Sequence, residues 1–512
     1  MHNKENSTFL GIELGSTRIK AVAIDTQFTP ISSGDYTWAS SYENGVWTYD
    51  LDEVWVGIKA AITGIEDRKN VKAMGVSAMM HGYLAFDKDW NLLTPFRTWQ
   101  NTTTAQAAEE LTELFGFNIP QRWSIAHLYQ AVLNEEEHIS KIAHITTLAG
   151  YVHYVLTGMN CIGIGEASGM FPIDSDNLCY DAEMLRKFND LIAERKLPWK
   201  IEDLLPNVLV AGENAGVLST QGAEKLDNLL PPGIPMAPAE GDAGTGMTAT
   251  NAVAARTGNV SAGTSIFAMV VLEKMLSKVH SEIDMVTTPT GKPVAMVHCN
   301  NCTSDMNGWV NMFRETFQLL GYDVQMGELY TKLYRKSMEG APDCGGITIY
   351  NYLAGEPVTG FDEGRPLIVR NPSVPLTLAN FIRAQLYSTM ATLATGMEIL
   401  HQEDVVIDRM MGHGGLFKTP VVGQKYMAAA TNAPVWVMET AGEGGPYGMA
   451  LLAAYLVEGN GLSLESYLDQ KVFVNAEAAV LDPDAEDVAG FRAYLTRFWD
   501  GLSVERSAIA HL

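Results

Sequence analysis

The sequence predicts a two-domain α/β protein with two similar halves and a cleft between them. The chain has 512 residues, more than one hydrophobic core usually serves. The triplet Gly15-Ser16-Thr17 recurs in kind as Gly263-Thr264-Ser265, and each triplet stands between two apolar or alternating strands. The triplets are 248 positions apart (263 − 15), close to half the chain. Strand and helix patterns alternate between them, as in mixed α/β proteins.

A stretch rich in Pro and Gly marks the division between the halves. It reads LLPPGIPMAPAEGDAGTG, over residues 229–246, and its end lies just before the second triplet. We therefore expect an N-terminal domain over residues 1–253 and a C-terminal domain over residues 254–512.

The hydrophobic pattern predicts the individual elements in order. Residues 9–25, FLGIELGSTRIKAVAID, are expected to form a β-hairpin. A short apolar strand is expected over 71–76, followed by a loop over 77–82 and by a second hairpin built from 83–86 and 92–93. Helices are expected over 51–65, 103–115, 376–401 and 445–458.

Composition and charge narrow the class of protein. Hydrophobic residues make up 47% and charged residues 19%, as in a globular protein with a sizeable core. Sixty acids against 35 bases give a net charge of -25, which repels nucleic acid and anionic lipid. The start, MHNKENST, lacks the apolar core of a signal peptide, and no apolar run approaches membrane-spanning length. We expect a cytoplasmic protein without nucleic-acid or membrane partners.

The five cysteines are an odd number spread thinly along the chain, which predicts reduced thiols. Cys299 and Cys302 form a CxxC directly after His298. A zinc site of this kind usually needs a second pair, and the sequence has none. We interpret both cysteines as buried small residues, with a metal or redox pair as the alternative.

The two Gly/Ser/Thr turns predict a phosphate site. The sequence has neither the GxGxxG turn of dinucleotide-binding proteins nor the GxxxxGK loop that cradles phosphates in many nucleotidases. A tight turn of Gly and hydroxyl residues can instead point backbone N–H groups and hydroxyls into one concavity that suits phosphate oxygens. Two such turns, one per half, can hold a polyphosphate from opposite sides.

Six segments, taken in order, resemble the FGGY carbohydrate kinases of the actin, hexokinase and heat-shock ATPase superfamily. They are IELGSTRIKAVAID (first phosphate motif), AMMHGYLAFDKDWNLL (sugar loop of xylulokinases), EGDAGTGM (catalytic Asp), NVSAGTSIF (second phosphate motif), and MGHGGLFKTP with EGGPYGMALLAA (adenosine region). The resemblance implies an actin/hexokinase-like, ribonuclease H-like fold with a duplicated mixed-sheet core. It also implies ATP and Mg²⁺ as cofactors, a small sugar as substrate and, because family members are often dimers, a homodimer.

The resemblance also implies roles for individual residues. Asp242 is the expected general base, since a carboxylate can orient the attacking hydroxyl and accept its proton. Glu13 takes the place of the usual Asp that, with Asp242, holds the metal. Ordinary structural roles, a solvent-facing strand acid for Glu13 and a turn residue for Asp242, are the alternatives. Sugar contacts are implied for Met80, His81, Trp99, Asn101 and Asp242, and nucleotide contacts for Gly15, Ser16, Thr17, Lys20, Gly263, Thr264, Ser265, Gly414, Gly415, Gly444 and Gly445.

The chain departs from the family pattern mainly around the sugar. Met79 replaces a frequent Gln, Ala243 replaces a frequent Asn, and Gln100-Asn101 replaces the usual Asn-Asp. His413 interrupts the usual glycine run of the adenosine region. These differences leave the substrate open more than the chemistry.

The expected function is ATP-dependent phosphorylation of a ketopentose such as xylulose. Ribulose, fuculose, rhamnulose and glycerol remain alternative substrates, because discrimination among such sugars rests on hydrogen-bond positions. A chaperone-type ATPase of the same superfamily would need an additional peptide-binding surface, and the two halves occupy nearly the whole chain. A degenerate, non-catalytic sugar-binding protein is a further alternative: Asp242 and both turns argue against it, while Glu13 and the altered sugar loop keep it open.

Overall fold

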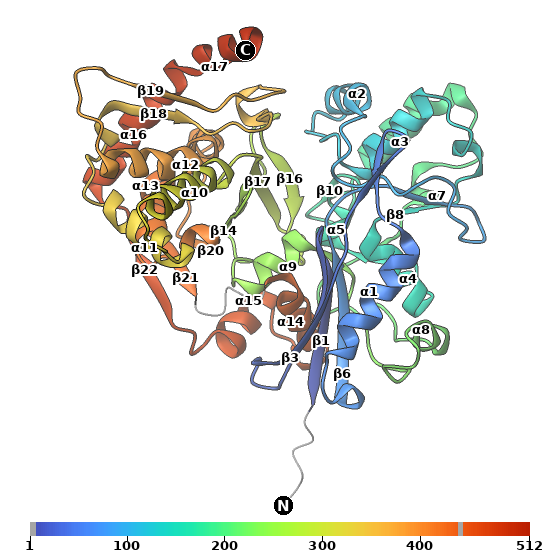
Figure 1. The fold of residues 1–512 in the computed structure, drawn as a ribbon. Helices are drawn as coiled ribbons and strands as arrows, with labels where there is room; N and C mark the ends of the chain where they lie inside the picture. Colours follow the sequence, from blue (N-terminus) through green and yellow to red (C-terminus); the bar gives the residue numbers. More distant parts are fainter. Residues whose placement is uncertain (1–6, 439–443) are drawn as a thin grey trace, which may run out of the picture.

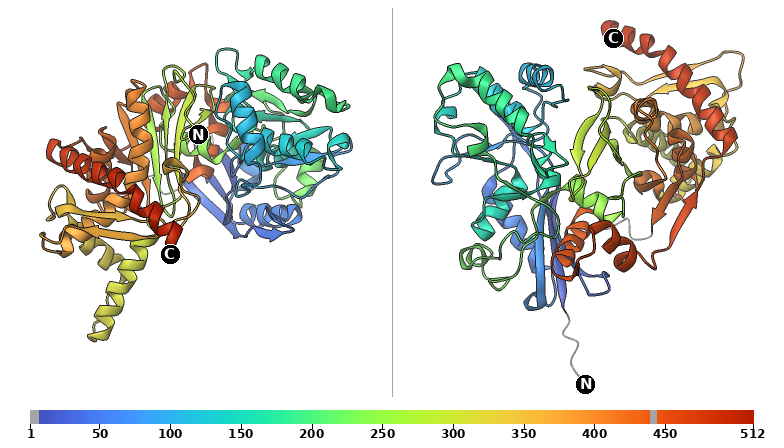
Figure 2. Two further views of the ribbon diagram at one scale, coloured as in Figure 1. Left: turned by 90° about the horizontal axis from the view of Figure 1, so that it is seen from above. Right: turned by 180° about the vertical axis from the view of Figure 1, so that it is seen from behind.

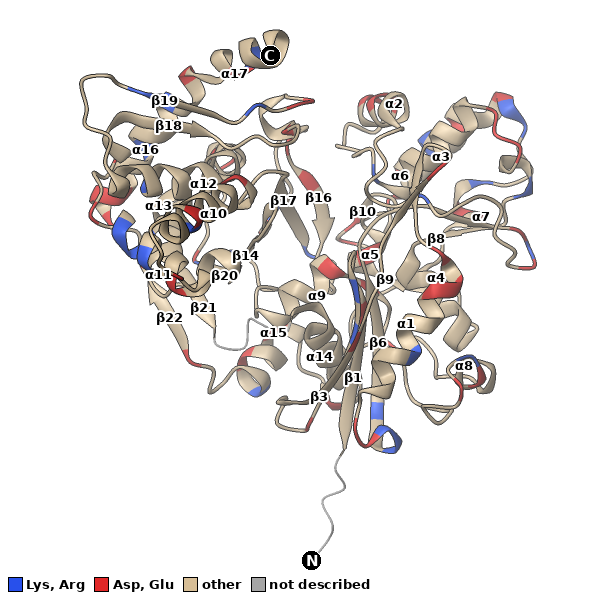
Figure 3. Ribbon diagram, in the orientation of Figure 1, with Lys and Arg blue, Asp and Glu red and all other residues tan. Residues whose placement is uncertain are grey.

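The computed structural model describes residues 7–438 and 444–512, which form two lobes (Figure 1). The polar residues 1–6 and Glu443 of the adenosine segment lie outside the described part. Acidic residues are distributed over both lobes (Figure 3), in keeping with the net charge of -25. No helix in the described ranges combines the length and apolar character needed to cross a membrane.

The N-terminal lobe is built on a five-stranded sheet. Its order is β13-β6-β1-β2-β3, with bounds Glu240–Gly241, Val71–Ala78, Thr8–Leu14, Arg18–Ile24 and Pro30–Thr37. Strands β1 and β2 form the predicted antiparallel hairpin, while β6 runs parallel to β1 and β13 runs parallel to β6. The predicted strand over 71–76 is confirmed and continues two residues further, because Ser77 and Ala78 still pair with β1.

The C-terminal lobe repeats this arrangement in a seven-stranded sheet. Its order is β16-β17-β15-β14-β20-β21-β22, with bounds Asp284–Thr287, Pro293–Cys299, Ile266–Val271, Thr257–Ala262, Arg409–Gly414, Val435–Met438 and Ala478–Leu481. The inner strands β17-β15-β14-β20-β21 match β3-β2-β1-β6-β13 in order and in direction. The expected duplication, with a glycine-turned hairpin opening each half, is therefore confirmed.

The four predicted helices are present with bounds shifted by a few residues. They are α1 (Leu51–Thr63), α2 (Ala105–Phe115), α12 (Leu378–Gln402) and α14 (Gly444–Glu458). Helix α1 begins where the Asp50 side chain accepts a hydrogen bond from the Asp52 N–H, and its apolar face covers β2 and β3. Helix α12 is buried on most sides, which agrees with its long apolar sequence.

The remaining elements fill out the two lobes. In the N-terminal half they are β4 (Ser41–Glu43), β5 (Val46–Thr48), β7 (Leu84–Phe86), α3 (Ser124–Leu133), β8 (His144–Thr146), α4 (Leu148–Thr157), β9 (Cys161–Gly163), α5 (Ile164–Ala167), β10 (Ile173–Asp174), β11 (Cys179–Tyr180), α6 (Ala182–Ile192), α7 (Ile201–Leu204), β12 (Asn207–Leu209), α8 (Thr220–Lys225) and α9 (Asp242–Ala249). In the C-terminal half they are α10 (Ser304–Leu319), α11 (Met326–Ser337), β18 (Ile347–Tyr350), β19 (Leu367–Arg370), α13 (Val422–Thr431), α15 (Leu464–Tyr467), α16 (Ala485–Asp500) and α17 (Leu502–His511).

In the second predicted hairpin, the first strand, β7, pairs mainly with a different strand from the one expected. Strand β7 does meet the returning chain, through a Phe86–Leu92 bridge and a hydrogen bond from the Leu93 N–H to the Ala85 carbonyl. Its regular ladder, however, is with β8, more than fifty residues further along the chain. The chain between β7 and β8 forms α2 and α3. No local sequence pattern indicates that the chain then returns to pair with β7.

The two lobes meet at a pair of central helices, α9 and α14 (Figures 1 and 2). Helix α9 follows β13 directly, and α14 is the first described element after β21. Helix α14 packs on α9 and also on β1 and β6, so a helix of the C-terminal half covers the N-terminal sheet. The division near residue 253 lies between α9 and β14 and stays a prediction.

Glycines allow this close packing. A Cβ atom on Gly448 would lie 1.9 Å from the Thr245 carbonyl oxygen of α9, and one on Gly11 would lie 2.0 Å from the Pro446 carbonyl oxygen. Gly448 therefore belongs to the interior of α14, where it contacts α9. Replacing either glycine with a larger residue would force the helices or the sheet apart.

Candidate active site

Asp242 is the first residue of α9 and directly follows β13. Because β13 runs parallel to β6, the end of β6 brings the following sugar loop beside it. The Met80 N–H donates a hydrogen bond to Oδ1 of Asp242 at 3.2 Å. The predicted base and one predicted sugar contact, 162 positions apart, therefore meet directly.

The surroundings of Asp242 raise its pKa to about 6, mainly because the burial of the carboxyl among protein atoms disfavours its charge. Hydrogen bonds from backbone N–H groups, that of Met80 first, and the charge of Arg122 act in the opposite direction. The residue nevertheless keeps exposed surface, and this surface opens into a pocket. A carboxyl with this pKa can accept a proton near neutral pH.

Glu13 is the second acid at this pocket. It lies on β1 and faces the start of α14, where a Cβ atom on Gly445 would be 2.6 Å from Glu13 Oε1. Burial, followed by the charge of Asp242, raises the pKa of Glu13 to about 8, and Lys20, its cross-strand neighbour on β2, lowers it. The charge of Asp242 thus disfavours the ionisation of Glu13, and a cation placed near both would remove that penalty.

The pocket has a volume of about 170 Å³ and lies where the two halves meet. Its walls come from β1, α9, β14, β15, β20 and the start of α14. The lining residues are Glu13, Asp242, Gly246, Ala249, Thr250, Asn259, Phe267, Met269, His413, Gly444 and Gly445. Four predicted site residues, from both halves of the chain, are therefore brought together here: Glu13, Asp242, Gly444 and Gly445.

The first Gly/Ser/Thr turn is fixed by the aromatic residues around it. The Gly15 N–H closes the turn on the Arg18 carbonyl at 2.8 Å. The Trp38 indole N–H donates to the Gly15 carbonyl at 2.7 Å, and the Tyr49 hydroxyl donates to the Ser16 carbonyl at 2.7 Å. The Trp99 indole N–H donates to the Ser16 hydroxyl at 3.3 Å, which places this predicted sugar contact beside the first turn.

The second turn is supported by the segment that follows β17. The Gly263 N–H closes the turn on the Ser265 carbonyl at 2.9 Å, and the Cys302 N–H donates to the Thr264 carbonyl at 3.0 Å. Cys299 and Cys302 are free and buried, as expected for small core residues, and burial raises the pKa of both thiols. Over residues 7–438 and 444–512, no group of three or more His, Cys, Asp or Glu side chains is arranged to hold a metal ion.

Gly414 and Gly415 lie directly beside the second turn. Gly414 pairs with Ala262, the last residue of β14, and adopts a φ of 100°. A Cβ atom there would be 2.4 Å from the Ala262 carbonyl oxygen, so this close approach requires glycine. Gly414, a predicted nucleotide contact, thus lies against the last strand residue before the second turn.

The sugar loop holds His81 in an unusual conformation. His81 has a φ of 73°, in the left-handed region that non-glycine residues rarely occupy, and is only 4% exposed. Its ring stacks on Trp123 and its Nδ1 lies 3.3 Å from the Gly169 carbonyl oxygen. Burial, then the charge of Arg122, lowers its pKa well below the usual value, so the ring is neutral. Such strain persists where surrounding contacts hold the residue in place.

Arg122 is a site residue that the sequence did not indicate. Its guanidinium forms an ion pair with Asp284 of β16, and its backbone carbonyl accepts a hydrogen bond from the Gly82 N–H at 3.1 Å. Its charge lowers the pKa of Asp242, of His81 and of His298 on β17. Arg122 therefore joins the sugar loop to the opposite lobe. No local pattern could reveal this, because Asp284 lies 162 positions away.

Asn101 braces a loop outside the pocket lining. It is 3% exposed, its Nδ2 donates to the Trp47 carbonyl at 2.8 Å, and its Oδ1 accepts from the Trp47 N–H at 2.8 Å. These bonds occupy the side chain within the loop that carries Trp99. A sugar contact for Asn101 stays a prediction.

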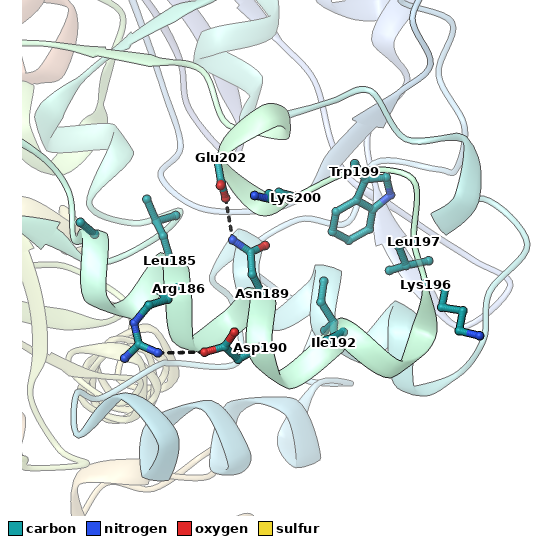
Figure 4. Close-up of a pocket in the computed structure, with 12 residues that line it drawn as sticks. Leu185, Arg186, Asn189, Asp190, Ile192, Lys196, Leu197, Trp199, Lys200 and Glu202 are labelled. Carbon is teal, nitrogen blue, oxygen red and sulfur yellow. Dashed lines mark hydrogen bonds and ion pairs between the residues drawn. The ribbon is translucent and has the colours of Figure 1, made fainter.

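A larger groove of about 590 Å³ lies on the outer surface of the N-terminal lobe, between α6 and α7 (Figure 4). Polar groups along it are paired with one another: Arg186 with Asp190 at 2.8 Å, and Asn189 with Glu202 at 2.7 Å. It contains none of the predicted site residues. We therefore place the candidate active site at the smaller interlobe pocket.

Comparison with known proteins agrees with the predicted fold. The FGGY family of carbohydrate kinases matches with its N-terminal domain over residues 8–248 and with its C-terminal domain over residues 258–457. A xylulose kinase from Haemophilus influenzae is 22% identical over 440 residues, covering 80% of this chain and 82% of that protein. A glycerol kinase from Thermococcus kodakarensis is 25% identical over 355 residues, covering 65% and 66%.

Solved structures share the whole fold. That of a xyloylose kinase from Brucella ovis has a TM-score of 0.79 at 18% identity and covers 98% of this chain and 100% of that one. That of a gluconate kinase from Lactobacillus acidophilus has a TM-score of 0.78 at 17% identity and covers 99% of both. The predicted duplicated two-domain fold is thus confirmed. The chain belongs to the FGGY family of carbohydrate kinases, phosphotransferases that use ATP.

Proposed function

We propose that this protein transfers the terminal phosphoryl group of Mg·ATP to a hydroxyl of a small sugar, and that the sugar is a ketopentose such as xylulose. The observation that carries the proposal is the convergence of Asp242 and Glu13 on one pocket between the halves, with Asp242 bonded to the Met80 N–H of the sugar loop. The proposed base thereby lies beside the proposed sugar loop and beside residues proposed to bind the nucleotide.

In the proposed reaction, Asp242 accepts the proton of the attacking hydroxyl. The Met80 N–H holds Oδ1, which leaves Oδ2 for the sugar. As the sugar oxygen forms its bond to the terminal phosphorus, the bond from that phosphorus to the bridging oxygen breaks, the proton passes to Asp242, and ADP leaves. A pKa of about 6 keeps Asp242 mostly ionised at pH 7 while allowing this transfer.

The residues present also fit a magnesium ion. Glu13 and Asp242 offer hard oxygen ligands, and the charge of Asp242 disfavours that of Glu13 until a cation is near. A protein site with few carboxylates suits Mg²⁺, which usually keeps several waters and binds the phosphates of its substrate. There the ion would supply charge neutralisation for the phosphates.

Backbone groups of both halves are proposed to hold the nucleotide. The turns Gly15-Ser16-Thr17 and Gly263-Thr264-Ser265 would meet the phosphates from opposite sides, with Lys20 next to Glu13 on the neighbouring strand. Gly414 and Gly415 would pack on the adenosine, and Gly444 and Gly445 begin α14, whose N-terminal end favours negative charge.

The sugar is proposed to lie against Met80, His81 and Trp99. Xylulose is supported by the names of several relatives at low identity, while others are glycerol kinases and one similar structure is a gluconate kinase. His81 is neutral and can therefore exchange hydrogen bonds with hydroxyls without attracting an anion.

A sugar panel tests the function. ADP release would be followed with the purified protein, Mg·ATP and one of xylulose, ribulose, fuculose, rhamnulose, glycerol or gluconate. Turnover that is highest with a ketopentose supports the whole proposal. Turnover that is highest with another compound supports a kinase with a different substrate. Tight sugar binding without turnover would favour the degenerate alternative. Fractionation of the source cells and light scattering would test the predicted cytoplasmic location and homodimer.

A further inference from the structure

The pocket wall opposite Glu13 and Asp242 carries two polar side chains without partners. Asn259 lies on β14 and is 0% exposed, and neither its Oδ1 nor its Nδ2 has a hydrogen-bond partner among the described residues. Nε2 of His413, on the neighbouring strand β20, is also buried and unpartnered. Both residues line the pocket.

The strand register shows that these side chains share the pocket-facing side of the sheet. Asn259 is directly opposite Met269 on β15, and Ser261 is opposite both Phe267 and His413. Residues paired in this way, and residues two apart on one strand, point to the same face. Met269, Phe267 and His413 all line the pocket. Across it lies Gly246 of α9, where a Cβ atom would be in ordinary van der Waals contact with Asn259 Nδ2, at 3.9 Å.

An amide in this position needs a partner. A side-chain amide offers two N–H donors and a carbonyl acceptor, and buried polar groups are almost always hydrogen-bonded in native proteins. A Ser or Thr in place of Asn259 would leave only one hydroxyl group unpaired instead of an NH₂ group and a carbonyl oxygen. The partner of Asn259 therefore comes from what enters the pocket.

The two walls together specify the occupant. The wall with Glu13 and Asp242 presents two carboxyl groups, whose oxygens suit a cation. The wall with Asn259 and His413 carries no charge, because burial lowers the pKa of His413, and it offers hydrogen bonds to an oxygen-rich group. A phosphate paired with a hydrated divalent cation satisfies both walls.

We propose that Asn259, with His413 beside it, binds the phosphate end of the metal-bound nucleotide from the C-terminal half. This inference rests on the proposed function, since it assigns a ligand to the same pocket. Asn259 would donate to a phosphate oxygen, and its carbonyl oxygen would favour the cation that accompanies the phosphate, so its contribution depends on the cation. The unpaired amide lowers the stability of the ligand-free protein, and the contact with the ligand offsets this cost.

The test compares Asn259→Leu with the wild type in binding and in thermal stability, without sugar and without turnover. Leu has the same branched heavy-atom skeleton as Asn and no polar atoms, so the ligand-free variant should melt at the same temperature as the wild type or higher. Its affinity for Mg·ADP, measured by calorimetry, should fall about tenfold, the effect of losing hydrogen bonds to a charged group. Its affinity for ADP in EDTA should change much less.

Gln385 of α12 provides the matched control, because it is a fully buried amide outside the pocket lining. Gln385→Leu should leave the Mg·ADP affinity unchanged. Should Asn259→Leu not fold, Asn259→Ala leaves the strand intact and should show the same loss of Mg·ADP affinity.

The outcomes separate this inference from the proposed function. Equal Mg·ADP affinity in the wild type and in the Asn259 variants overturns the inference and leaves the kinase proposal standing. A lower melting temperature of Asn259→Leu with unchanged Mg·ADP affinity also overturns it, because the amide would then be satisfied by a structural water. A wild-type protein that binds no Mg·ADP overturns both.

Discussion

The Met80 N–H donates to the Asp242 carboxylate at 3.2 Å, at the ends of the parallel strands β6 and β13. This bond orients one carboxylate oxygen and links the proposed base to the sugar loop. Because both residues follow strand ends, their separation is set by the sheet rather than by flexible side chains.

Asp242→Asn should abolish most activity without affecting nucleotide binding. The Asn side chain keeps an oxygen for the Met80 N–H but cannot accept the sugar's proton. We expect the catalytic rate to fall by about two to four orders of magnitude, measured by sugar-dependent ADP release, with calorimetry showing unchanged Mg·ADP affinity. Asp190→Asn, in the outer groove, serves as the control. Near-normal phosphorylation by Asp242→Asn would remove Asp242 from the role of base.

Glu13→Gln should raise the Mg²⁺ concentration needed for half-maximal activity. The change removes one of the two acidic groups at the pocket while keeping the size of the side chain beside Gly445. Titrations of Mg²⁺ at saturating ATP and sugar measure the effect, and Lys88→Gln at the exposed surface is the control. An unchanged magnesium titration would argue that Glu13 is an ordinary strand acid.

Because Glu240 is buried, we expect the stability of the folded protein to fall as the pH rises. Burial raises its pKa from 4.5 to about 8, so the native state keeps a proton that the unfolded chain loses near its ordinary pKa. Its stabilising contribution is therefore complete below about pH 4.5 and is lost as the pH rises through about 8. Glu240→Gln should flatten the decrease in melting temperature over this range, measured by calorimetry. If the melting temperature of the variant fell with pH in the same way as that of the wild type, Glu240 would not be the group responsible.

The Arg122–Asp284 ion pair should contribute to stability across the lobes. Removing one partner leaves the other partly buried and unpaired, which costs about 3 kcal/mol for a well-buried pair and less where water has access. We expect Arg122→Met to lower the free energy of unfolding in denaturant. Combining it with Asp284→Asn should recover part of the loss. Additive effects of the two changes would show that the pair is not coupled.

His81 offers a test of the sugar site that separates contact from backbone strain. Asn tolerates the left-handed conformation at this position better than β-branched residues do. His81→Asn should therefore fold normally and raise the KM for the sugar, with little change in the KM for ATP. His81→Val should in addition lower the melting temperature. An unchanged sugar KM in His81→Asn would place the sugar elsewhere.

Features set by neighbouring residues were predictable from the sequence. Both glycine-turned hairpins were expected, because alternating strands and Gly/Ser/Thr turns are local patterns, and their recurrence half a chain apart indicated the duplicated sheets. The helix expected over 376–401 is observed as Leu378–Gln402, since its apolar length and its Thr377 cap are also local.

Features set by distant residues required the tertiary structure. The path of the chain decides that Arg122 meets Asp284, that Gly448 of α14 packs on Thr245 of α9, and that Asn259 remains unpaired at the pocket. The sequence by itself determined the type of each half and the residues able to perform the chemistry. Only the packing of α9 and α14 between the two sheets decided which of those residues share a pocket. Contacts between distant segments depend on how closely their backbones approach, and no local sequence pattern encodes that distance.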